Sequence, residues 1–287
     1  MTKIFDRNSG EIVEPPEYQG EWLKKLYETK WGNFLLPLVT SSLFSTLYTI
    51  IDYTSLSKKK ISEFLETYQI SLNDYQEEDY QNFADFFIRK LKPAALTIAS
   101  DKQVLSVAQA KLLVLPIKED QSFLIKGQNY QMEELLQDTS WARYFKNGTL
   151  FIYRLAVNDY YRYLVAESGK VVTNRKIFGK LHTIREIAQK KRKVFKENKR
   201  EYTLIQTQEG TILQMEIGAL LVGKIINPPE ENYQRGKEKG WFSLGGSTIL
   251  VAYPEGTVTV DQDIQRQSAL GIETQVEIGE GVGWKND

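Results

Sequence analysis

Residues 235–253 read RGKEKGWFSLGGSTILVAY, and the rest of the chain is organised around this stretch. The pattern predicts a charged glycine turn, a short strand, a corner at Gly245-Gly246-Ser247-Thr248, and a second strand rich in β-branched and aromatic residues. A Gly-Gly-Ser corner is either ordinary turn chemistry or a place where a serine is held against its own preceding carbonyl. The rest of the sequence bears on which of the two holds.

Composition narrows the class of protein. The 287 residues are enough for one large domain or two, and 41% hydrophobic with 26% charged residues is typical of a soluble globular protein. Lysine plus arginine and aspartate plus glutamate balance at 37 each, so no overall attraction to nucleic acid is expected. The absence of cysteine excludes disulfides and thiolate sites, and the single histidine, His182, excludes multi-histidine metal sites. The N-terminus does not resemble a secretory signal, which favours a cytoplasmic location.

Residues 31–51 contain no charged side chain. Twenty-one such residues are long enough to cross a bilayer, but an asparagine, a proline and six serines or threonines keep the hydrophobicity modest. Three interpretations stay open: a helix packed in the core, a helix in the membrane interface, and a true span. Trp31 at one end and Tyr48 and Tyr53 at the other favour the interface, where such rings concentrate.

The remaining pattern divides the chain near residue 95. Residues 1–20 are expected to be irregular or short strands. Helices are predicted from Ser57 to Tyr68 and over 80–91, with Pro93 ending the second. Beyond them, strands are predicted over 104–117, 122–127, 148–157, 161–167, 202–208, 212–226, 247–253, 256–260 and 274–279, and helices over 133–145 and 183–199. The expected fold class is therefore α+β, with a helical region 1–95 and a β-rich domain 96–287.

Two basic runs have both a structural and a functional interpretation. Lys58-Lys59-Lys60 is interpreted as a solvated helix start. QKKRKVFKENKR (189–200) is either a solvated helix end or a contact with anionic phospholipid headgroups.

Seven blocks of sequence, in order along nearly the whole chain, resemble the phosphatidylserine decarboxylase family, in particular its shorter bacterial forms with a Gly-Gly-Ser-Thr processing site. They are FADFFIRKLK (83–92), KGQNYQMEELL (126–136), FKNGTLFIYRL (145–155), FKENKREY (195–202), QMEIGALLVGKI (214–225), GKEKGWFSLGGSTILVAY (236–253) and QSALGIETQVEIGEGVG (267–283).

The resemblance implies a self-processing proenzyme. The hydroxyl of Ser247 attacks the carbonyl of Gly246, the amide becomes an ester, and β-elimination followed by hydrolysis leaves chains 1–246 and 247–287, the second beginning with a pyruvoyl group. That group forms a Schiff base with the amine of phosphatidylserine and serves as electron sink when CO2 leaves to give phosphatidylethanolamine. The resemblance further implies no metal, a phospholipid partner, a homodimer and peripheral attachment to the cytoplasmic side of a membrane.

The sequence departs from the family at the positions of the residues that transfer protons. The family's aspartate falls on Ala110, followed by Lys111 instead of glycine, and its two histidines fall on Tyr161 and Leu164. The matching residues Asp159, Tyr160 and Arg162 anchor that second alignment.

Four residues are formal substitutes for the missing relay: His182, Tyr161, Asp101 and Asp159. One acid–base residue is typically worth about 10²–10⁴ in rate, and a whole relay on the order of 10⁶. Two hypotheses follow. The chain is a decarboxylase that works with substitute proton carriers, or it is an uncleaved, catalytically degenerate homologue that acts as a lipid-binding or structural protein.

Overall fold

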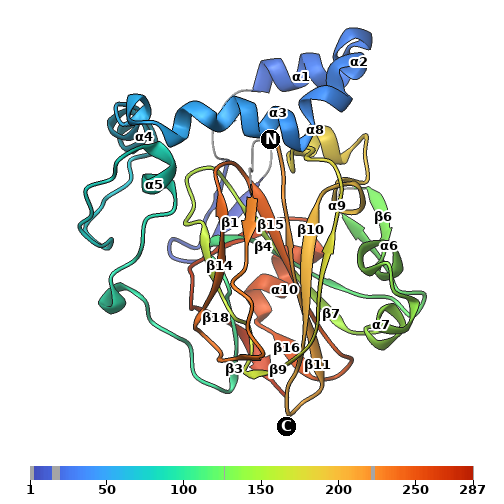
Figure 1. The fold of residues 1–287 in the computed structure, drawn as a ribbon. Helices are drawn as coiled ribbons and strands as arrows, with labels where there is room; N and C mark the ends of the chain where they lie inside the picture. The colour runs from blue at the N-terminus through green and yellow to red at the C-terminus, as the bar shows by residue number, and fades with distance from the viewer. Residues whose placement is uncertain (1–2, 15–19, 126, 221–223, 287) are drawn as a thin grey trace.

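A large mixed sheet forms the centre of the molecule (Figure 1). The computed structural model describes residues 3–14, 20–125, 127–220 and 224–286. In spatial order the ten strands are β13 (Asn232–Tyr233), β9 (Gly169–Ile177), β10 (Arg200–Gln206), β11 (Thr211–Ile217), β15 (Ser247–Tyr253), β7 (Thr149–Leu155), β4 (Ala110–Pro116), β17 (Glu273–Val276), β1 (Ile4–Asp6) and β2 (Ile12–Val13). Neighbours are antiparallel except β1 and β17, which run parallel.

Strand β15 lies in the middle of this sheet because its sequence, STILVAY, suits burial on both faces. All seven residues are buried, and β11 and β7 pair with it on either side. In a sheet that is covered on both faces, a central strand needs apolar side chains on both of its faces, and a nearly continuous run of apolar and β-branched residues provides them. The corner before Ser247 is thereby anchored to the most protected part of the fold.

Smaller elements cover the central sheet. They are the sheet of β12 (Lys224–Ile226), β14 (Glu238–Ser243) and β8 (Arg162–Leu164), the sheet of β16 (Val258–Val260), β18 (Gly281–Lys285) and β3 (Gln103–Leu105), the hairpin of β5 (Ser122–Ile125) and β6 (Gln128–Gln131), and the helices α6 (Met132–Leu136), α7 (Thr139–Tyr144), α8 (Glu186–Gln189), α9 (Val194–Glu197) and α10 (Gln262–Ala269). Helix α10 is tied to the sheet where Ser268 Oγ accepts the Val114 N–H at 3.0 Å.

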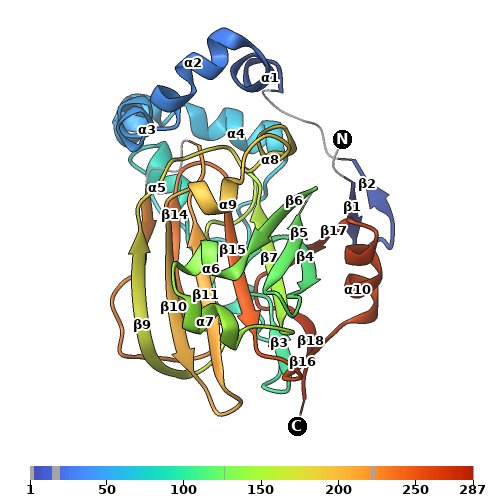
Figure 2. The same ribbon diagram turned by 90° about the vertical axis from the view of Figure 1, so that its right-hand side faces the viewer.

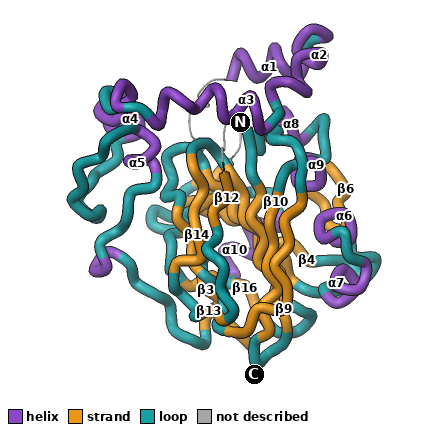
Figure 3. Tube along the Cα trace, in the orientation of Figure 1, coloured by secondary structure: helices purple, strands orange, loops and turns teal. Residues whose placement is uncertain are grey.

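The N-terminal helices lie together across one end of the sheet (Figures 1 and 2). They are α1 (Gly20–Glu28), α2 (Lys30–Val39), α3 (Ser42–Thr49), the 3₁₀ turns η1 (Ile50–Tyr53) and η2 (Ser55–Ser57), α4 (Lys60–Tyr68) and α5 (Phe83–Phe87). The 3₁₀ turn η3 (Pro93–Ala95) follows lower down, at the side of the molecule (Figure 1). The tube view separates this helical end from the strands beneath it (Figure 3). The α+β class expected from the sequence is confirmed.

Several predicted elements are interrupted. The expected strand 104–117 is two strands, β3 and β4, and the expected helix 133–145 is two helices, because Gln137 adopts φ 50° and Asp138 caps the second helix through Trp141 N–H. The helix expected over 80–91 is only Phe83–Phe87, and that over 183–199 is the short pair α8 and α9. The expected strand 212–226 ends at Ile217 and resumes at Lys224; residues 221–223 within it, like Lys126 in 122–127, lie outside the described residues.

The core-helix interpretation of 31–51 is wrong. The segment forms α2 and α3, which continues into η1, with an 80° bend between Lys30–Val39 and Ser42–Tyr53. On α2 only Gly32 and Leu36 are buried, and on α3 only Ser45 and Thr49, whose hydroxyl donates to the Ser45 carbonyl at 2.8 Å. Most of the large apolar side chains are exposed: Trp31, Phe34, Leu35, Leu38, Leu43, Leu47, Tyr48, Ile50, Ile51, Tyr53 and, in η2, Leu56. We call these eleven residues the apolar surface.

Among the described residues, no single helix is long and apolar enough to cross a membrane, although this bent pair passes the same test of length and composition when taken together.

Candidate active site

Ser247 is the first residue of β15 and is fully buried. The turn before it uses two left-handed residues, Leu244 at φ 56° and Gly245 at φ 86°, so a glycine suits position 245. Ser247 lies opposite Leu155, and its Oγ has no hydrogen-bond partner among the described residues. A buried hydroxyl without a partner is costly. The neighbouring Thr248 Oγ1 is also buried without a partner among the described residues, so what distinguishes Ser247 is its place directly after Gly246 at the corner.

Buried ion pairs lie beside this corner. Lys111 is opposite Arg154, and Arg154 is opposite Thr248 in the next strand. Lys111 Nζ lies 2.5 Å from Asp159 Oδ1, and Arg154 pairs with Glu273. Because cross-strand partners share a face of the sheet, Lys111, Arg154 and Thr248 lie on one face and Ser247 on the other.

The turn after β7 brings Tyr161 back toward the corner. Ala156, the residue after Ser247's strand partner Leu155, donates its N–H to Asp159 Oδ2 at 2.6 Å, and its carbonyl accepts the Tyr161 hydroxyl at 2.8 Å. The Tyr161 ring packs on Phe87 with centroids 4.3 Å apart. Burial, reinforced by the charge of Asp159, raises the pKa of Tyr161 well above its ordinary value. The phenol is therefore a hydrogen-bond donor, and not a base near neutrality.

The other two relay positions carry no titratable group. Ala110 begins β4, which is separated from β15 by β7, so two strand spacings of about 4.8 Å put it roughly 10 Å from Ser247. Leu164 is buried in β8 and its N–H donates to Val107 O at 2.8 Å. Next to Ala110, in the turn before β4, Gln109 accepts from Tyr160 N–H and donates to Glu277 Oε2 at 2.8 Å. Sequence reasoning missed Gln109 and Glu277, whose contact joins positions 168 residues apart.

His182 and Asp101 interact with residues away from Ser247. His182 is hydrogen-bonded through Nδ1 to the Tyr27 hydroxyl at 3.0 Å, and its Nε2 lies 3.3 Å from Glu197 Oε2. Burial lowers the pKa of His182 to about 4, so the imidazole is neutral at physiological pH. The Asp101 side chain is 98% exposed beside Arg235, which places it outside the buried corner.

One loop that the sequence did not indicate covers the Gly246–Ser247 bond. A Cβ placed on Gly246 would lie 3.6 Å from Ile184 Cδ1. The loop containing Ile184 is held by the helical end, because Leu181 N–H donates to Thr40 O at 2.8 Å and Thr183 N–H donates to the Tyr27 hydroxyl at 3.3 Å. The helical end and the candidate reaction centre are thus physically connected.

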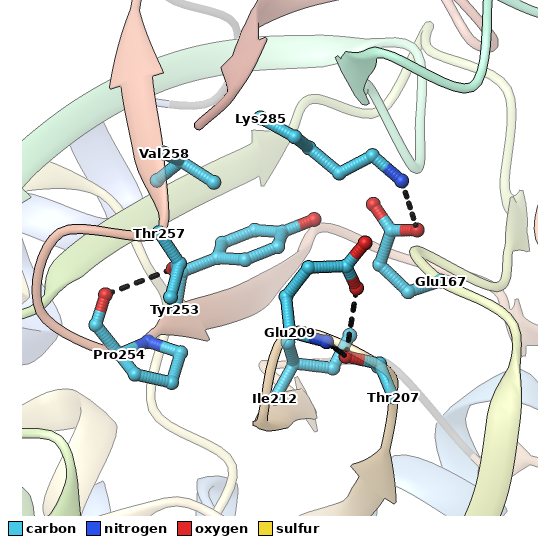
Figure 4. Close-up of a pocket in the computed structure, with 9 residues that line it drawn as sticks. All are labelled: Glu167, Thr207, Glu209, Ile212, Tyr253, Pro254, Thr257, Val258 and Lys285. Atoms are coloured by element: carbon cyan, nitrogen blue, oxygen red, sulfur yellow. Dashed lines mark hydrogen bonds and ion pairs between the residues drawn. The ribbon is translucent and has the colours of Figure 1, made fainter. Parts of the chain in front are cut away.

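A small pocket lies at the opposite end of β15 (Figure 4). Tyr253, Glu167 and Lys285 are among its lining residues, and its volume of about 10 Å³ has room for one water. Tyr253 is six residues from Ser247, about 20 Å along the strand. This pocket is therefore separate from the corner. Within the described ranges no group of three acidic or histidine side chains could hold a metal ion.

Comparison with known proteins shows which family the chain belongs to. Residues 83–283 match the phosphatidylserine decarboxylase family model. The chain is 40% identical over 287 residues to phosphatidylserine decarboxylase proenzyme 2 of Clostridium acetobutylicum, with 99% of each chain covered. It is 36% identical to the phosphatidylserine decarboxylase proenzyme of Ruminiclostridium cellulolyticum and 35% to that of Clostridium tetani, covering 99% of this chain and 97% and 99% of theirs. The chain belongs to the phosphatidylserine decarboxylase family.

Proposed function

We propose that this chain is a slowly maturing phosphatidylserine decarboxylase proenzyme that works at a membrane surface. The observation that carries the proposal is Ser247: a fully buried hydroxyl without a partner among the described residues, directly after Gly246 and under a covering loop. These residues fit a pyruvoyl precursor. The pyruvoyl group, once made, supplies an electron sink for loss of CO2 from the serine headgroup.

Slow maturation follows from the contacts around the corner. Tyr161 donates to Ala156, Asp159 is paired with Lys111, and His182 is bonded to Tyr27. Each missing acid–base group costs about 10²–10⁴ in rate. Self-cleavage happens once per molecule, so it tolerates such a loss better than repeated turnover does.

A second candidate function is favoured by the absence of a titratable side chain at Ala110 and Leu164. It is an unprocessed homologue that keeps the fold and binds phospholipid without turning it over. Both candidates share the lipid surface and differ only at the Gly246–Ser247 bond.

The intact mass of the purified protein, followed over days, separates the two. Slow maturation predicts a full-length chain that gradually gives fragments 1–246 and 247–287, the second with a pyruvoyl N-terminus, while Ser247→Ala stays whole. A chain that never cleaves would leave the second candidate. Complete cleavage within minutes would show an efficient proton carrier and contradict slow maturation.

The proposed attachment to the membrane rests on the apolar surface. Trp31 and Phe34 are 79% and 76% exposed. Helices α2 and α3, which carry most of the apolar surface, lie at one end of the molecule (Figure 1). Bare apolar surfaces of this kind mark lipid or protein contacts. We place this end on the cytoplasmic face of a membrane, as the resemblance implies, and expect a homodimer, to be tested by light scattering in detergent.

A further inference from the structure

A buried ion pair lies on the same face of the central sheet as Ser247. Lys239 Nζ is 2.9 Å from Glu216 Oε2 and 3.0 Å from Glu216 Oε1, and both side chains are completely buried. Burying two charges is expensive, and an apolar pair of similar size is often equally stable or more stable. Stability alone is therefore a weak reason for this pair, and its position beside the corner suggests another.

The strand register places Glu216 next to the corner. Glu216 in β11 is opposite Ile249 in β15, two residues after Ser247. Residues two apart on a strand share a face of the sheet, so Glu216 and Ser247 lie on the same face. Diagonal neighbours of this kind are about 7–8 Å apart, which is within reach of a long side chain. Ala110, where the family has its aspartate, is two strands away on the other side of Ser247.

The groups around Glu216 hold it as a buried carboxylate. Asn227 Nδ2 donates to Glu216 Oε2 at 3.0 Å, and the Tyr163 hydroxyl donates to Asn227 Oδ1 at 2.8 Å. Burial raises the pKa of Glu216 above its ordinary value, and the charge of Lys239 opposes this effect. A carboxylate with a raised pKa is a stronger base than an ordinary one.

Glu216 differs from Asp159 in the face that it occupies. Both carboxylates accept hydrogen bonds through both oxygens. Lys111, the partner of Asp159, lies on the face opposite to Ser247, whereas Glu216 lies on the face of Ser247. Glu216 must exchange one of its hydrogen bonds for the hydroxyl of Ser247, and this exchange is consistent with slow maturation.

We propose that Glu216 accepts the proton of Ser247 when the chain cleaves itself. The hydroxyl oxygen of Ser247 forms a bond with the carbonyl carbon of Gly246, and its proton moves to the Glu216 carboxylate. The bond between that carbon and the Ser247 nitrogen then breaks, and the nitrogen takes the proton from Glu216 as the ester forms. No proton is gained or lost overall.

Lys239 has a separate part in this step. Its ammonium balances the negative charge while that charge moves from the carboxylate to the tetrahedral oxygen, so the buried cluster stays neutral. The inference rests on the proposed self-cleavage and names the proton acceptor for it.

The test is the rate at which the full-length protein gives fragments 1–246 and 247–287, measured by intact mass with hydroxylamine present. Hydroxylamine cleaves the ester as it forms, so the rate reports the shift from amide to ester and not the later elimination. Loss of one general base typically costs about 10²–10⁴ in rate, so Glu216→Gln should be slower by at least about 100-fold. Ser247→Ala should stay whole.

Two further variants separate proton transfer from folding. Glu216→Gln leaves Lys239 buried without its partner, whereas Glu216→Gln/Lys239→Met removes both charges and should keep a urea midpoint near that of the wild type. The double variant should cleave as slowly as the single one. Glu201→Gln is the matched control, because Glu201 is a buried carboxylate directly opposite Glu216 and one strand farther from β15. It should cleave at the wild-type rate.

The pH dependence is a readout that a purely structural role would not change. The ratio of the wild-type rate to the Glu216→Gln rate should rise with pH as Glu216 loses its proton, and taking the ratio cancels the pH dependence of hydroxylamine. The titratable groups that face Glu216 are Lys239, Glu201, Tyr163 and Tyr233.

The outcomes distinguish this inference from the proposed function. A wild-type rate in both Glu216 variants, a ratio that does not change with pH, or a Glu201→Gln variant slowed as much as Glu216→Gln would overturn the inference and leave self-cleavage in place. A wild type that gives no fragments with hydroxylamine would instead contradict the proposed function, and the inference would fail with it.

Discussion

Lys111 Nζ lies 2.5 Å from Asp159 Oδ1, with the two side chains only 8% and 4% exposed. The other oxygen of Asp159 accepts the Ala156 N–H. Asp159 matches the family pattern, and this pairing shows that it shapes the turn after β7. Its two oxygens are both committed, so it is not poised to take a proton from Ser247.

Removing one partner of this buried pair should destabilise the protein strongly. In Lys111→Met the Asp159 carboxylate stays buried without its cation, and we expect a loss of about 3–5 kcal/mol in the free energy of unfolding. Urea unfolding measures it. Lys58→Met, which removes an exposed pair with Asp79, is the matched control and should leave the midpoint unchanged. A Lys111→Met midpoint equal to that of the wild type would contradict the role given to the pair.

Restoring the relay should accelerate self-cleavage. Ala110→Asp, Tyr161→His and Leu164→His in one chain return the three family groups to the positions that the resemblance gives them. We expect cleavage faster by about 10²–10⁴ for each acid–base group that becomes functional. Intact mass against time is the measurement, and the same triple variant with Ser247→Ala must stay whole. An unchanged rate would mean that the Gly246–Ser247 bond itself is not set up for the reaction.

The sequence predicted the strands near the corner well and the helices poorly. STILVAY forms a strand because β-branched and apolar residues follow one another without interruption, so the local sequence was enough to predict it. Residues 133–145 look like one helix, yet Gln137 leaves the helical region and Asp138 starts a new one. Such breaks depend on what the segment packs against, and the spacing of apolar residues along the chain carries no information about that.

The candidate site, too, could be predicted only in part from the sequence. Ser247 follows from local sequence, because the Gly-Gly-Ser corner is contiguous. Its surroundings do not: Ile184 is far from it in the chain and meets the corner only in the folded state. The contact of Gln109 with Glu277, near the relay position Ala110, likewise forms only on folding. The exposure of α2 and α3 was equally hidden, since an uncharged segment suits a core, an interface or a span until its packing is known.

The pH dependence of stability should contain a contribution from His182. Its pKa is about 4 in the folded protein, below the ordinary 6.5, so the folded state binds fewer protons between these values. Stability from the neutral ring is fully present above pH 6.5 and is lost as the pH falls toward 4, with a slope of at most about 1.36 kcal/mol per pH unit. The groups facing the ring are Tyr27, Lys180, Arg192 and Glu197.

Comparing the wild type with His182→Gln isolates this contribution, because the carboxylates of the rest of the chain titrate in both. Chemical unfolding from pH 4 to 7.5 should show a difference in stability that shrinks with falling pH. A difference that is constant over this range would contradict a depressed His182 pKa.

Charges placed on the apolar surface should abolish binding to vesicles. Leu38 and Leu43 lie on α2 and α3 and are 61% and 68% exposed. Burying a leucine side chain is worth about 1.5–3 kcal/mol, so losing one contact weakens partitioning roughly tenfold or more, and a charge adds to the penalty. Flotation with phosphatidylcholine–phosphatidylglycerol vesicles should recover the wild type and not Leu38→Glu/Leu43→Glu. Leu124→Glu is the control, because Leu124 is 56% exposed on β5, away from the helical end. If all three proteins float equally, the apolar surface is not the lipid contact, and a protein partner must cover it.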